Sequence, residues 1–417
     1  MSDTSIPRTG LEVPPALPGP PPLPSAGDTI GISWSGPTWG LVGLGFINFL
    51  LSVVTLGIYH FWGKTEVRRR LAASIRINSE PMEYTGTGLE LFLGFIIILV
   101  VVLIPFQVLL FGTQIYFGPQ SLVTALTPLL LLPGIFYLYG VAAYRARRYR
   151  RSRLRWRGVR GALVGNSWTY GLQVLWTTVA GQFTYGWLTP WRDNYLHRRL
   201  TNDTRFGDRP LKYTGQAGSL YPSYTIGWVG QLVALLVVFG AAAAVIIPPA
   251  IPLFNDFKAI TDASDVVKPF DMWLEIWLNP SYAELWHKAY WLVAAGFGFL
   301  LLYILIVDLL WNFFYAREYS YFLQNTALEG LRFDLKVSVW GLFWLFFSNT
   351  LMSLFTFTIL SPVAEARVSK YFVERLSASG SIDFASILQS QERLSKTGEG
   401  LAEAFDVEAN SYFILSI

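Results

Sequence analysis

The chain has 417 residues, of which 53% are hydrophobic and only 14% are charged, and its mean hydropathy is +0.40. A soluble domain carries about 25% charged residues, so this composition excludes an ordinary soluble protein and predicts that lipid surrounds much of the chain. The absence of cysteine excludes disulfides and thiolate metal sites. The three histidines are scattered, so we expect no metal and no other cofactor.

The chain begins with a proline-rich segment, residues 1–30, which lacks the apolar core of a signal peptide and is predicted to be a disordered tail. Seven apolar stretches follow, and each approaches or exceeds the roughly 20 residues that cross a bilayer as a helix. They cover residues 39–61, 89–112, 121–144, 168–190, 226–249, 290–314 and 339–361.

Basic residues gather in some of the segments between these stretches. Residues 145–160 contain nine arginines, whereas residues 113–120 carry no charge and residues 251–289 are mainly acidic. The positive-inside rule therefore places the basic segments in the cytoplasm and the other two connections outside a bacterial inner membrane. An arginine beside an anionic leaflet gains about 1 kcal/mol. We therefore predict contact with anionic lipid headgroups, and no nucleic-acid binding, for Arg147, Arg148, Arg150 and Arg151.

The sequence repeats itself at an offset of 129 residues, which aligns Trp62 with Trp191 and Tyr84 with Tyr213 without a gap. A weaker third copy begins near Trp340. Tryptophan favours the membrane–water interface, so Trp62 and Trp191 are predicted to be interface anchors. The predicted organisation is a tail (1–30), a first repeat (31–160), a second repeat (161–338), a third partial repeat (339–383) and an amphipathic C-terminal tail (384–417).

A shorter unit recurs within the basic segments: a strand-like run, a turn and a second strand-like run. The five turns contain glycine or proline, as at Arg157-Gly158 and Ser379-Gly380. We predict five short β-hairpins at the cytoplasmic face. They are expected to pair into a sheet, because an isolated hairpin is marginal in water.

The side of the membrane on which each hairpin lies constrains the crossings. If residues 39–61, 168–190 and 339–361 each crossed the bilayer once, similar basic units would face opposite sides. Entering and leaving from one face avoids this, and it requires irregular backbone that is buried or wet. The predicted fold class is a mainly α polytopic membrane protein with four spans plus three re-entrant or interfacial hairpins. The alternative is seven plain spans.

Residues 48–71, NFLLSVVTLGIYHFWGKTEVRRRL, together with MEYTGTGLELF at 82–92, resemble the signature of the YjgN / DUF898 family of bacterial inner-membrane proteins. The resemblance extends over about residues 30–405. It departs from the family pattern at His60 and Gly63, and in the degenerate second copy at 184–188. It implies an inner-membrane location. Because the family has no established activity, it implies no mechanism.

Polar residues inside the apolar stretches are the candidates for function. Asp308 lies within a long apolar run, where a carboxylate is costly and faces either a cavity or a partner. Gln107 and Gln231 could line the same path, although interhelical hydrogen bonds explain them equally well. No phosphate loop or nucleophile–base pair is evident, so we do not expect an enzyme. Two functions remain: a small-solute or ion transporter, or a non-transporting membrane scaffold or lipid-interacting protein.

Overall fold

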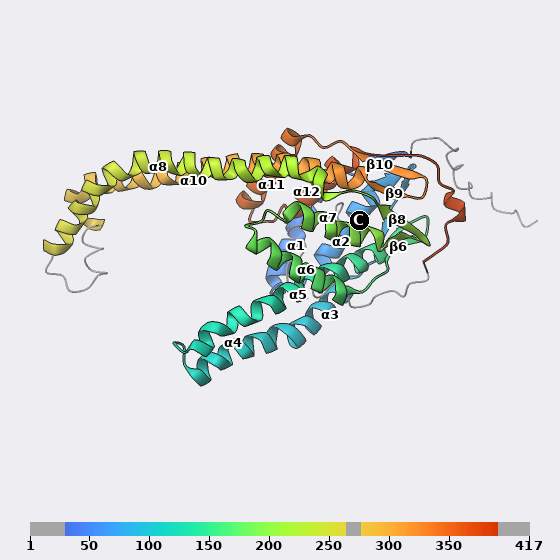
Figure 1. The fold of residues 1–417 in the computed structure, drawn as a ribbon, viewed down its shortest axis with the longest axis horizontal. Coiled ribbons are helices and arrows are strands. Elements are labelled where there is room, and N and C mark those ends of the chain that lie inside the picture. The colour runs from blue at the N-terminus through green and yellow to red at the C-terminus, as the bar shows by residue number, and fades with distance from the viewer. Residues whose placement is uncertain (1–29, 264–276, 391–417) are drawn as a thin grey trace, which may run out of the picture.

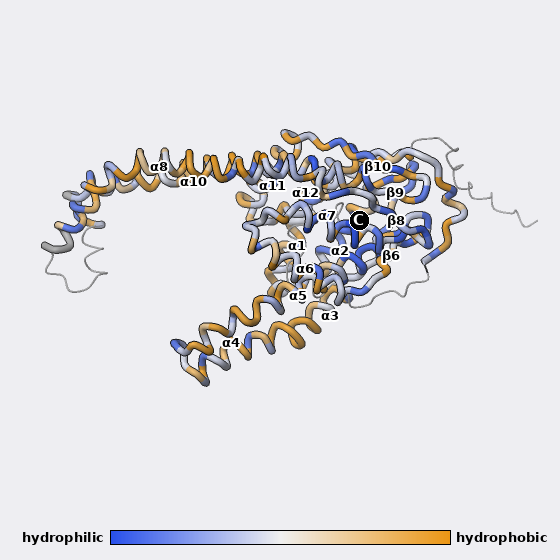
Figure 2. Tube along the Cα trace, viewed as in Figure 1, coloured by the Kyte–Doolittle hydropathy of each residue, from blue (hydrophilic) through white to orange (hydrophobic). Residues whose placement is uncertain are grey.

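The structure is a computed structural model, and it describes residues 30–263 and 277–390. Most of the predicted N-terminal tail and most of the predicted C-terminal amphipathic segment lie outside the described residues. Figure 1 shows two long helical pairs that extend from one body of short helices and strands. In Figure 2 the pairs are mostly hydrophobic, and the polar residues are concentrated in the strand-bearing part of the body.

Four helices are long and apolar enough to cross a membrane within the described residues. The first is formed by α3 (Gly88–Ile98), a π-helical turn (Leu99–Leu103) and α4 (Ile104–Phe117), and the second is α5 (Leu122–Arg153). The other two are α8 (Tyr221–Ala263) and α10 (Ala283–Gln324). Side-chain caps mark some starts: Thr87 accepts a hydrogen bond from the Glu90 amide, and Ser121 accepts one from the Thr124 amide.

The four spans form two separate pairs. Helix α4 packs on α5, and α8 packs on α10, but the described residues of the two pairs share no extensive contact. The pairs diverge as they leave the body (Figure 1). The α8–α10 pair bends near its far end, in the part of α8 that carries Pro248, Pro249 and Pro252, and proline is a common cause of such bends. The chain is thus a mainly helical membrane protein with two helical pairs rather than one bundle.

Three helical hairpins complete the helical part of the body. They consist of α1 (Val42–Val54) with α2 (His60–Ser74), α6 (Ser167–Phe183) with α7 (Thr189–Asn202), and α11 (Val339–Phe355) with α12 (Ser361–Val373). Each apolar stretch predicted at 39–61, 168–190 and 339–361 is therefore interrupted by a turn. Their apolar helices are shorter than the roughly 20 residues that a crossing requires. The alternative of seven plain spans does not fit these lengths.

Short strands follow the ends of these helices and pair antiparallel with their neighbours. Strands β5 (Leu154–Trp156) and β6 (Val159–Leu163) are joined at Arg157-Gly158, where both residues have positive φ. The remaining strands are β1 (Ile32–Trp34), β2 (Ile75–Ile77), β3 (Glu80–Pro81), β4 (Glu83–Tyr84), β7 (Thr204–Phe206), β8 (Arg209–Tyr213), β9 (Thr326–Leu328), β10 (Leu331–Leu335) and β11 (Leu376–Ser379).

The strands close into a ring. One sheet runs from β4 to β11 in chain order, and the other joins β1, β2 and β3. Only Met82 separates β3 from β4, and its amide donates to the Ile75 carbonyl (3.0 Å), so these two strands form one bent strand that belongs to both sheets. On the other side the Ile30 amide donates to the Ala378 carbonyl (3.1 Å), which joins the start of the chain to β11. Closure removes the free edges that an open sheet exposes.

The fifth predicted β-hairpin is wrong in its second strand. Strand β11 pairs with β10, the chain then turns at Gly380, and a short 3-10 helix (Phe384–Ser386) takes the place of the expected partner. The physical reason is that Ile30 already occupies the other edge of β11. The predicted boundary between residues 160 and 161 falls within β6, which pairs with β7, so strands from all the predicted repeats contribute to one ring.

Candidate functional site

The turns of the three helical hairpins share one local structure. Each begins with a threonine whose hydroxyl donates back into the preceding helix: Thr55 to Leu51, Thr184 to Ala180 and Thr356 to Met352. The next two residues have positive φ, namely Leu56-Gly57, Tyr185-Gly186 and Phe357-Thr358. Glycine adopts this conformation at little cost, whereas Thr358 takes the glycine position in the third turn. This substitution makes the third copy harder to recognise in the sequence.

The turn backbones satisfy their own hydrogen bonds. In the first hairpin the amides of Leu56, Gly57 and Ile58 donate to Val53, Ser52 and Thr55. The Tyr59 amide donates to the Thr55 hydroxyl (2.9 Å), and the second hairpin repeats this bond from Leu188 to Thr184. An unsatisfied amide costs several kcal/mol in hydrocarbon. The turns therefore meet the main requirement for backbone that is placed in lipid.

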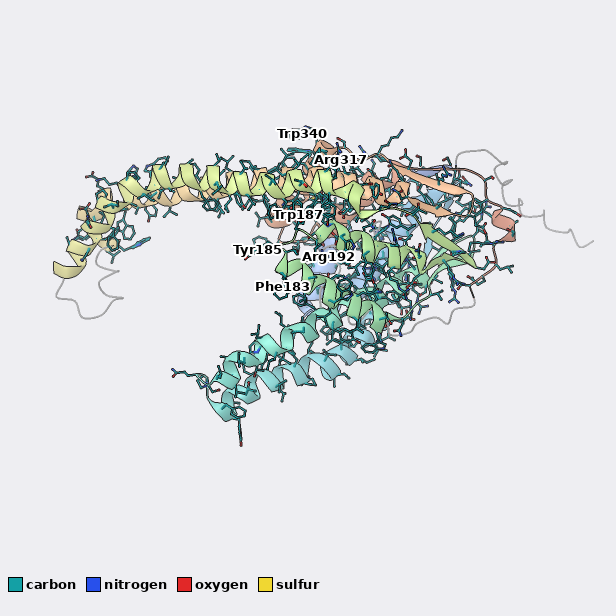
Figure 3. The ribbon with its side chains drawn as sticks, in the orientation of Figure 1. Phe183, Tyr185, Trp187, Arg192, Arg317 and Trp340 are labelled. Atoms are coloured by element: carbon teal, nitrogen blue, oxygen red, sulfur yellow. The ribbon has the colours of Figure 1, made fainter. Side chains whose placement is uncertain are left out.

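Large apolar side chains project from the turns without a partner in the body. Leu56 is 93% exposed, Tyr185 is 87% exposed and Phe357 is 80% exposed. In Figure 3 the labelled residues Phe183, Tyr185 and Trp187 lie at the side of the body from which the helical pairs extend. We call Leu56, Tyr185 and Phe357 the tip residues. Each tip residue therefore leaves a large side chain exposed at the end of its helical hairpin.

The three predicted intramembrane polar residues do not converge. Gln231 on α8 accepts a hydrogen bond from the Trp311 indole of α10 (2.9 Å), and Asp308 lies one helical turn before Trp311. The Asn312 amide group donates to the Asp308 carbonyl (2.8 Å). Gln107 lies exposed on α4, in the other helical pair. The structure therefore brings Asp308 and Gln231 near one another and leaves Gln107 apart.

The predicted lipid contact is wrong for Arg150, whose side chain is only 2% exposed. Arg148 donates to the carbonyls of Leu163 (3.0 Å) and Gly165, and Arg151 donates to the Thr204 hydroxyl. Arg148 and Arg151 therefore tie the last turns of α5 to β6, to the segment that follows β6 and to β7, at the point where α5 leads into strand β5. The predicted headgroup contact of Arg147 stays a prediction.

The two predicted tryptophan anchors pack partly within the body. Trp62 is 38% exposed, and its ring lies 5.8 Å from that of Phe92 on α3. Trp191 stacks on Tyr195 at 5.4 Å. Trp62 thus connects α2 to α3, and Trp191, whose ring also lies 5.3 Å from that of Trp176, connects α7 to α6.

Sequence reasoning missed a set of half-buried ionisable groups that follow the hairpin turns. Lys64, Asp193 and Glu365 each follow the turn threonine of their hairpin by nine residues. Burial raises the pKa of Asp193, although Arg192 at 2.9 Å opposes this shift. Burial also raises the pKa of Glu365, and Lys64 opposes the shift. The signal in the sequence that could have identified them is a charged residue nine positions after the turn threonine in each of the three copies.

His197 is a second buried titratable group that the sequence did not single out. Its ring stacks on Phe322 at 4.1 Å, and a ring nitrogen lies 3.1 Å from the Thr201 hydroxyl. Burial lowers the pKa of His197 to about 3, and the positive charges of Arg147 and Arg151 add to the effect. The imidazole is therefore neutral in the folded protein throughout the physiological pH range.

We expect His197 to make the fold sensitive to acid. A histidine in the unfolded chain has a pKa of about 6.5, so between pH 6.5 and about 3 the unfolded chain binds a proton that the folded chain does not. Burial of the neutral ring therefore costs no stability above pH 6.5. As the pH falls below 6.5 toward about 3, the free energy of unfolding decreases, because the unfolded chain gains the proton first. The loss is about 2 kcal/mol at pH 5. In His197→Phe, thermal stability should fall less between pH 7.5 and pH 5 than in the unmodified protein.

The exposed His287 supplies the matched control. His287→Phe should retain the full acid sensitivity, as measured by the remaining monodisperse fraction after heating in nanodiscs. Equal pH dependence of His197→Phe and the unmodified protein would show that His197 is not buried as a neutral ring.

Comparison with known proteins places the chain in a family. The family model described as "Bacterial protein of unknown function (DUF898)" matches residues 29–404. A relative, inner membrane protein YjgN of Salmonella typhimurium, is 28% identical over 92 residues. That alignment covers 22% of this chain and 23% of the relative. No solved structure matches. With its four long apolar helices, the chain is a multi-pass protein of the bacterial inner membrane, and it belongs to the DUF898 family.

Proposed function

We propose that this chain is a non-transporting, lipid-interacting protein of the inner membrane. Its two helical pairs would anchor it in the bilayer, and the turns of its three helical hairpins would insert into the cytoplasmic leaflet from the cytoplasmic side. The strand ring would then lie in the cytoplasm, where the positive-inside rule places its basic segments. Anionic headgroups around Arg147 would be its nearest lipid partners. The proposal includes no catalytic step.

The observation that carries this proposal is the set of three similar turns, whose amides mostly bond within the turn and whose tip residues are exposed. A turn of this kind in water would expose large apolar side chains for no gain, and such patches mark interaction surfaces. In a leaflet the same side chains are favourable, at roughly 25 cal/mol per Å² removed from water. The backbone pays no penalty there, because its amides already have acceptors.

The transporter alternative has weaker support. A transport path needs polar groups on several helices around a shared cavity. Here Asp308 and Gln231 lie on one helical pair and Gln107 lies on the other. The apolar windows of the four helices are at most 17% buried within the chain, so they mainly face their surroundings and enclose little. Two separate helical pairs whose surfaces face lipid are better suited to anchoring a protein in the membrane than to forming a transport path.

The depth of the tip residues tests the proposal. The chain has no cysteine, so Leu56→Cys, Tyr185→Cys and Phe357→Cys can each carry a single environment-sensitive fluorophore. In liposomes we expect blue-shifted emission that is quenched by nitroxide-labelled lipids and is resistant to aqueous iodide.

Lys212→Cys, on the exposed face of β8, is the matched control and should show the opposite quenching pattern. Tip fluorophores that respond to iodide as strongly as the one at Lys212 would mean that the hairpins stay in water, and would overturn the proposal. Replacing anionic lipid by neutral lipid should weaken leaflet contact if headgroups near the basic segments contribute.

A further inference from the structure

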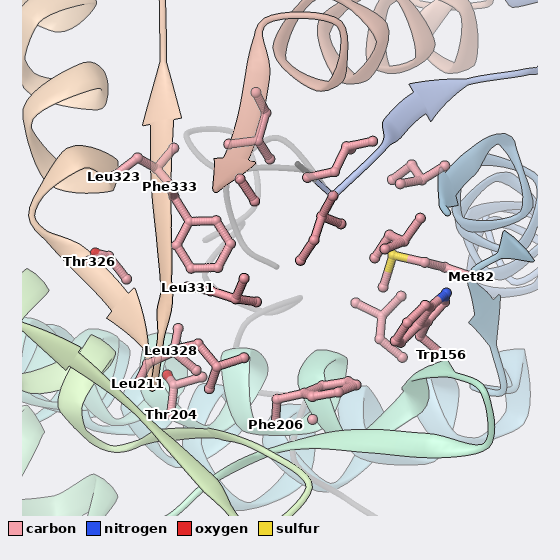
Figure 4. Close-up of a pocket in the computed structure, with 18 of the residues that line it drawn as sticks. Met82, Trp156, Thr204, Phe206, Leu211, Leu323, Thr326, Leu328, Leu331 and Phe333 are labelled. Atoms are coloured by element: carbon pink, nitrogen blue, oxygen red, sulfur yellow. The ribbon is translucent and has the colours of Figure 1, made fainter. Parts of the chain in front are cut away.

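The strand ring encloses an apolar cavity of about 320 Å³. Barrels of about eight strands are filled by their own side chains or hold one small ligand, and larger rings leave a lumen. Figure 4 shows Phe206, Phe333, Leu331 and Met82 arranged around this space. The lining is almost entirely hydrophobic and comes from strands of both sheets.

Described residues lie at both ends of the cavity and cover part of each end. At the helical end its lining includes Leu323 of α10 and Phe372 of α12. At the other end the Phe384 ring lies 4.9 Å from that of Trp156, and Gln389 bonds to the Gly158 carbonyl (2.9 Å). The cavity is therefore a sheltered space between the membrane-facing helices and the far rim of the ring.

An empty apolar space of this size is unfavourable. The cost of a cavity rises with its volume, and an apolar cavity does not fill with water. A cavity of about 150 Å³ takes up benzene, so 320 Å³ suits an apolar ligand about twice as large. A hydrocarbon chain of about twelve carbons, twice the carbon count of benzene, matches this size, whereas a lipid with two long chains does not fit.

Three charged residues, Arg151, Arg155 and Arg205, line the cavity and could offer it a polar anchor. Arg151, in the last turn of α5, lines the cavity, and its Nη1 donates to the Thr204 hydroxyl. Its Nε has no acceptor among the described residues. A carboxylate would satisfy this donor with a charge-assisted hydrogen bond.

We propose that the ring binds a free fatty acid of about twelve carbons, with its hydrocarbon chain among Phe206, Leu211 and Phe333 and its carboxylate at Arg151. The membrane that surrounds the spans supplies ligands of this class at high local concentration. The site uses none of the tip residues. A failure of the leaflet-insertion test would therefore leave this inference standing, and the reverse also holds.

A photoreactive fatty acid tests the site in the full chain. The protein would be reconstituted in nanodiscs, irradiated with diazirine-labelled lauric acid and digested, and the labelled peptides would be identified by mass spectrometry. We expect saturable labelling of the peptides that contain Phe206 and Phe333, displaced by unlabelled laurate. Leu211→Trp fills the lumen and should reduce this labelling at least about fivefold, since overfilling excludes a ligand. Lys212→Trp, on the outer face of the same strand, should change it less than twofold.

The carboxylate contact has its own readout, which a purely structural role of Arg151 would not change. The unmodified protein should prefer the acid over the matching diazirine alcohol by about tenfold, as expected for a hydrogen bond to a charged group. Arg151→Gln should abolish this preference. It remains informative if Leu211→Trp fails to fold.

Several outcomes would overturn the proposal. These are labelling confined to the spanning helices, equal labelling by acid and alcohol, or equal labelling of the lumen by a two-chain phospholipid analogue. The C-terminal residues 411–417, Ser-Tyr-Phe-Ile-Leu-Ser-Ile, are the rival occupant by composition. A chain truncated after Ser390 that labels many times more strongly than the full chain would identify this segment, and not a fatty acid, as the occupant.

Discussion

Replacement of Gly140 by leucine is expected to destabilise the protein by about 3 kcal/mol or more, because overpacking of a close helix contact forces the backbones apart. Helix α5 crosses α6 at this point. A Cβ atom on Gly140 would lie 2.7 Å from the Val174 Cβ and 2.9 Å from the Gly171 Cα. Small residues permit such close approach between membrane helices. The measurement is the thermal midpoint for loss of the monodisperse protein in nanodiscs.

Gly134, on the same helix, is the matched control. A Cβ atom there meets nothing within 4 Å. Gly134→Leu should leave the midpoint unchanged or raise it, since leucine has a helix propensity about 0.8–1 kcal/mol better than glycine. If Gly134→Leu and Gly140→Leu had equal midpoints, the packing of α5 on α6 described above would be wrong.

Single cysteines introduced into the cysteine-free chain should be either fully accessible or fully inaccessible to a thiol reagent outside the cell, according to the side of the membrane on which they lie. Cysteine at Asp265, between α8 and α10 but outside the described residues, should react with an impermeant thiol reagent in intact cells. Cysteine at Lys212 or Arg332 should not react. Each helical pair crosses outward and back, and each helical hairpin returns at its turn, so all strands remain on one side.

The labelling has an internal control, because Lys212 and Arg332 are exposed. Both cysteines should react once the cells are permeabilised. Reaction at Lys212 in intact cells would mean that residues 168–190 cross the membrane, and this would separate β6 from its partner β7. The strand ring and the proposed leaflet contact of the tip residues would then both fail.

The candidate sites show where sequence reasoning stopped. An arginine-rich segment beside a span is typical of a headgroup-binding surface, and this reading led to the predicted lipid contact of Arg150. Local sequence does not reveal that α5 ends against a ring of strands, where Arg148 and Arg151 bond to residues of other elements. Asp308 drew attention because an acidic residue in an apolar run is conspicuous. Asp193 and Glu365 did not, because they lie in short helices of ordinary polarity.

The sequence by itself determined the class of protein and its four long helices. A helix that is apolar over about 20 residues is long enough to cross the bilayer, and this length is visible in the local sequence. It also indicated most of the strand turns, because glycine in pairs such as Arg157-Gly158 adopts positive φ at little cost. Only the tertiary structure decided that the strands close into a ring, that the ring contains a cavity, and that Arg150 is buried. These features depend on contacts such as that between Ile30 and Ala378, which lie at opposite ends of the described chain and leave no periodic pattern in either segment.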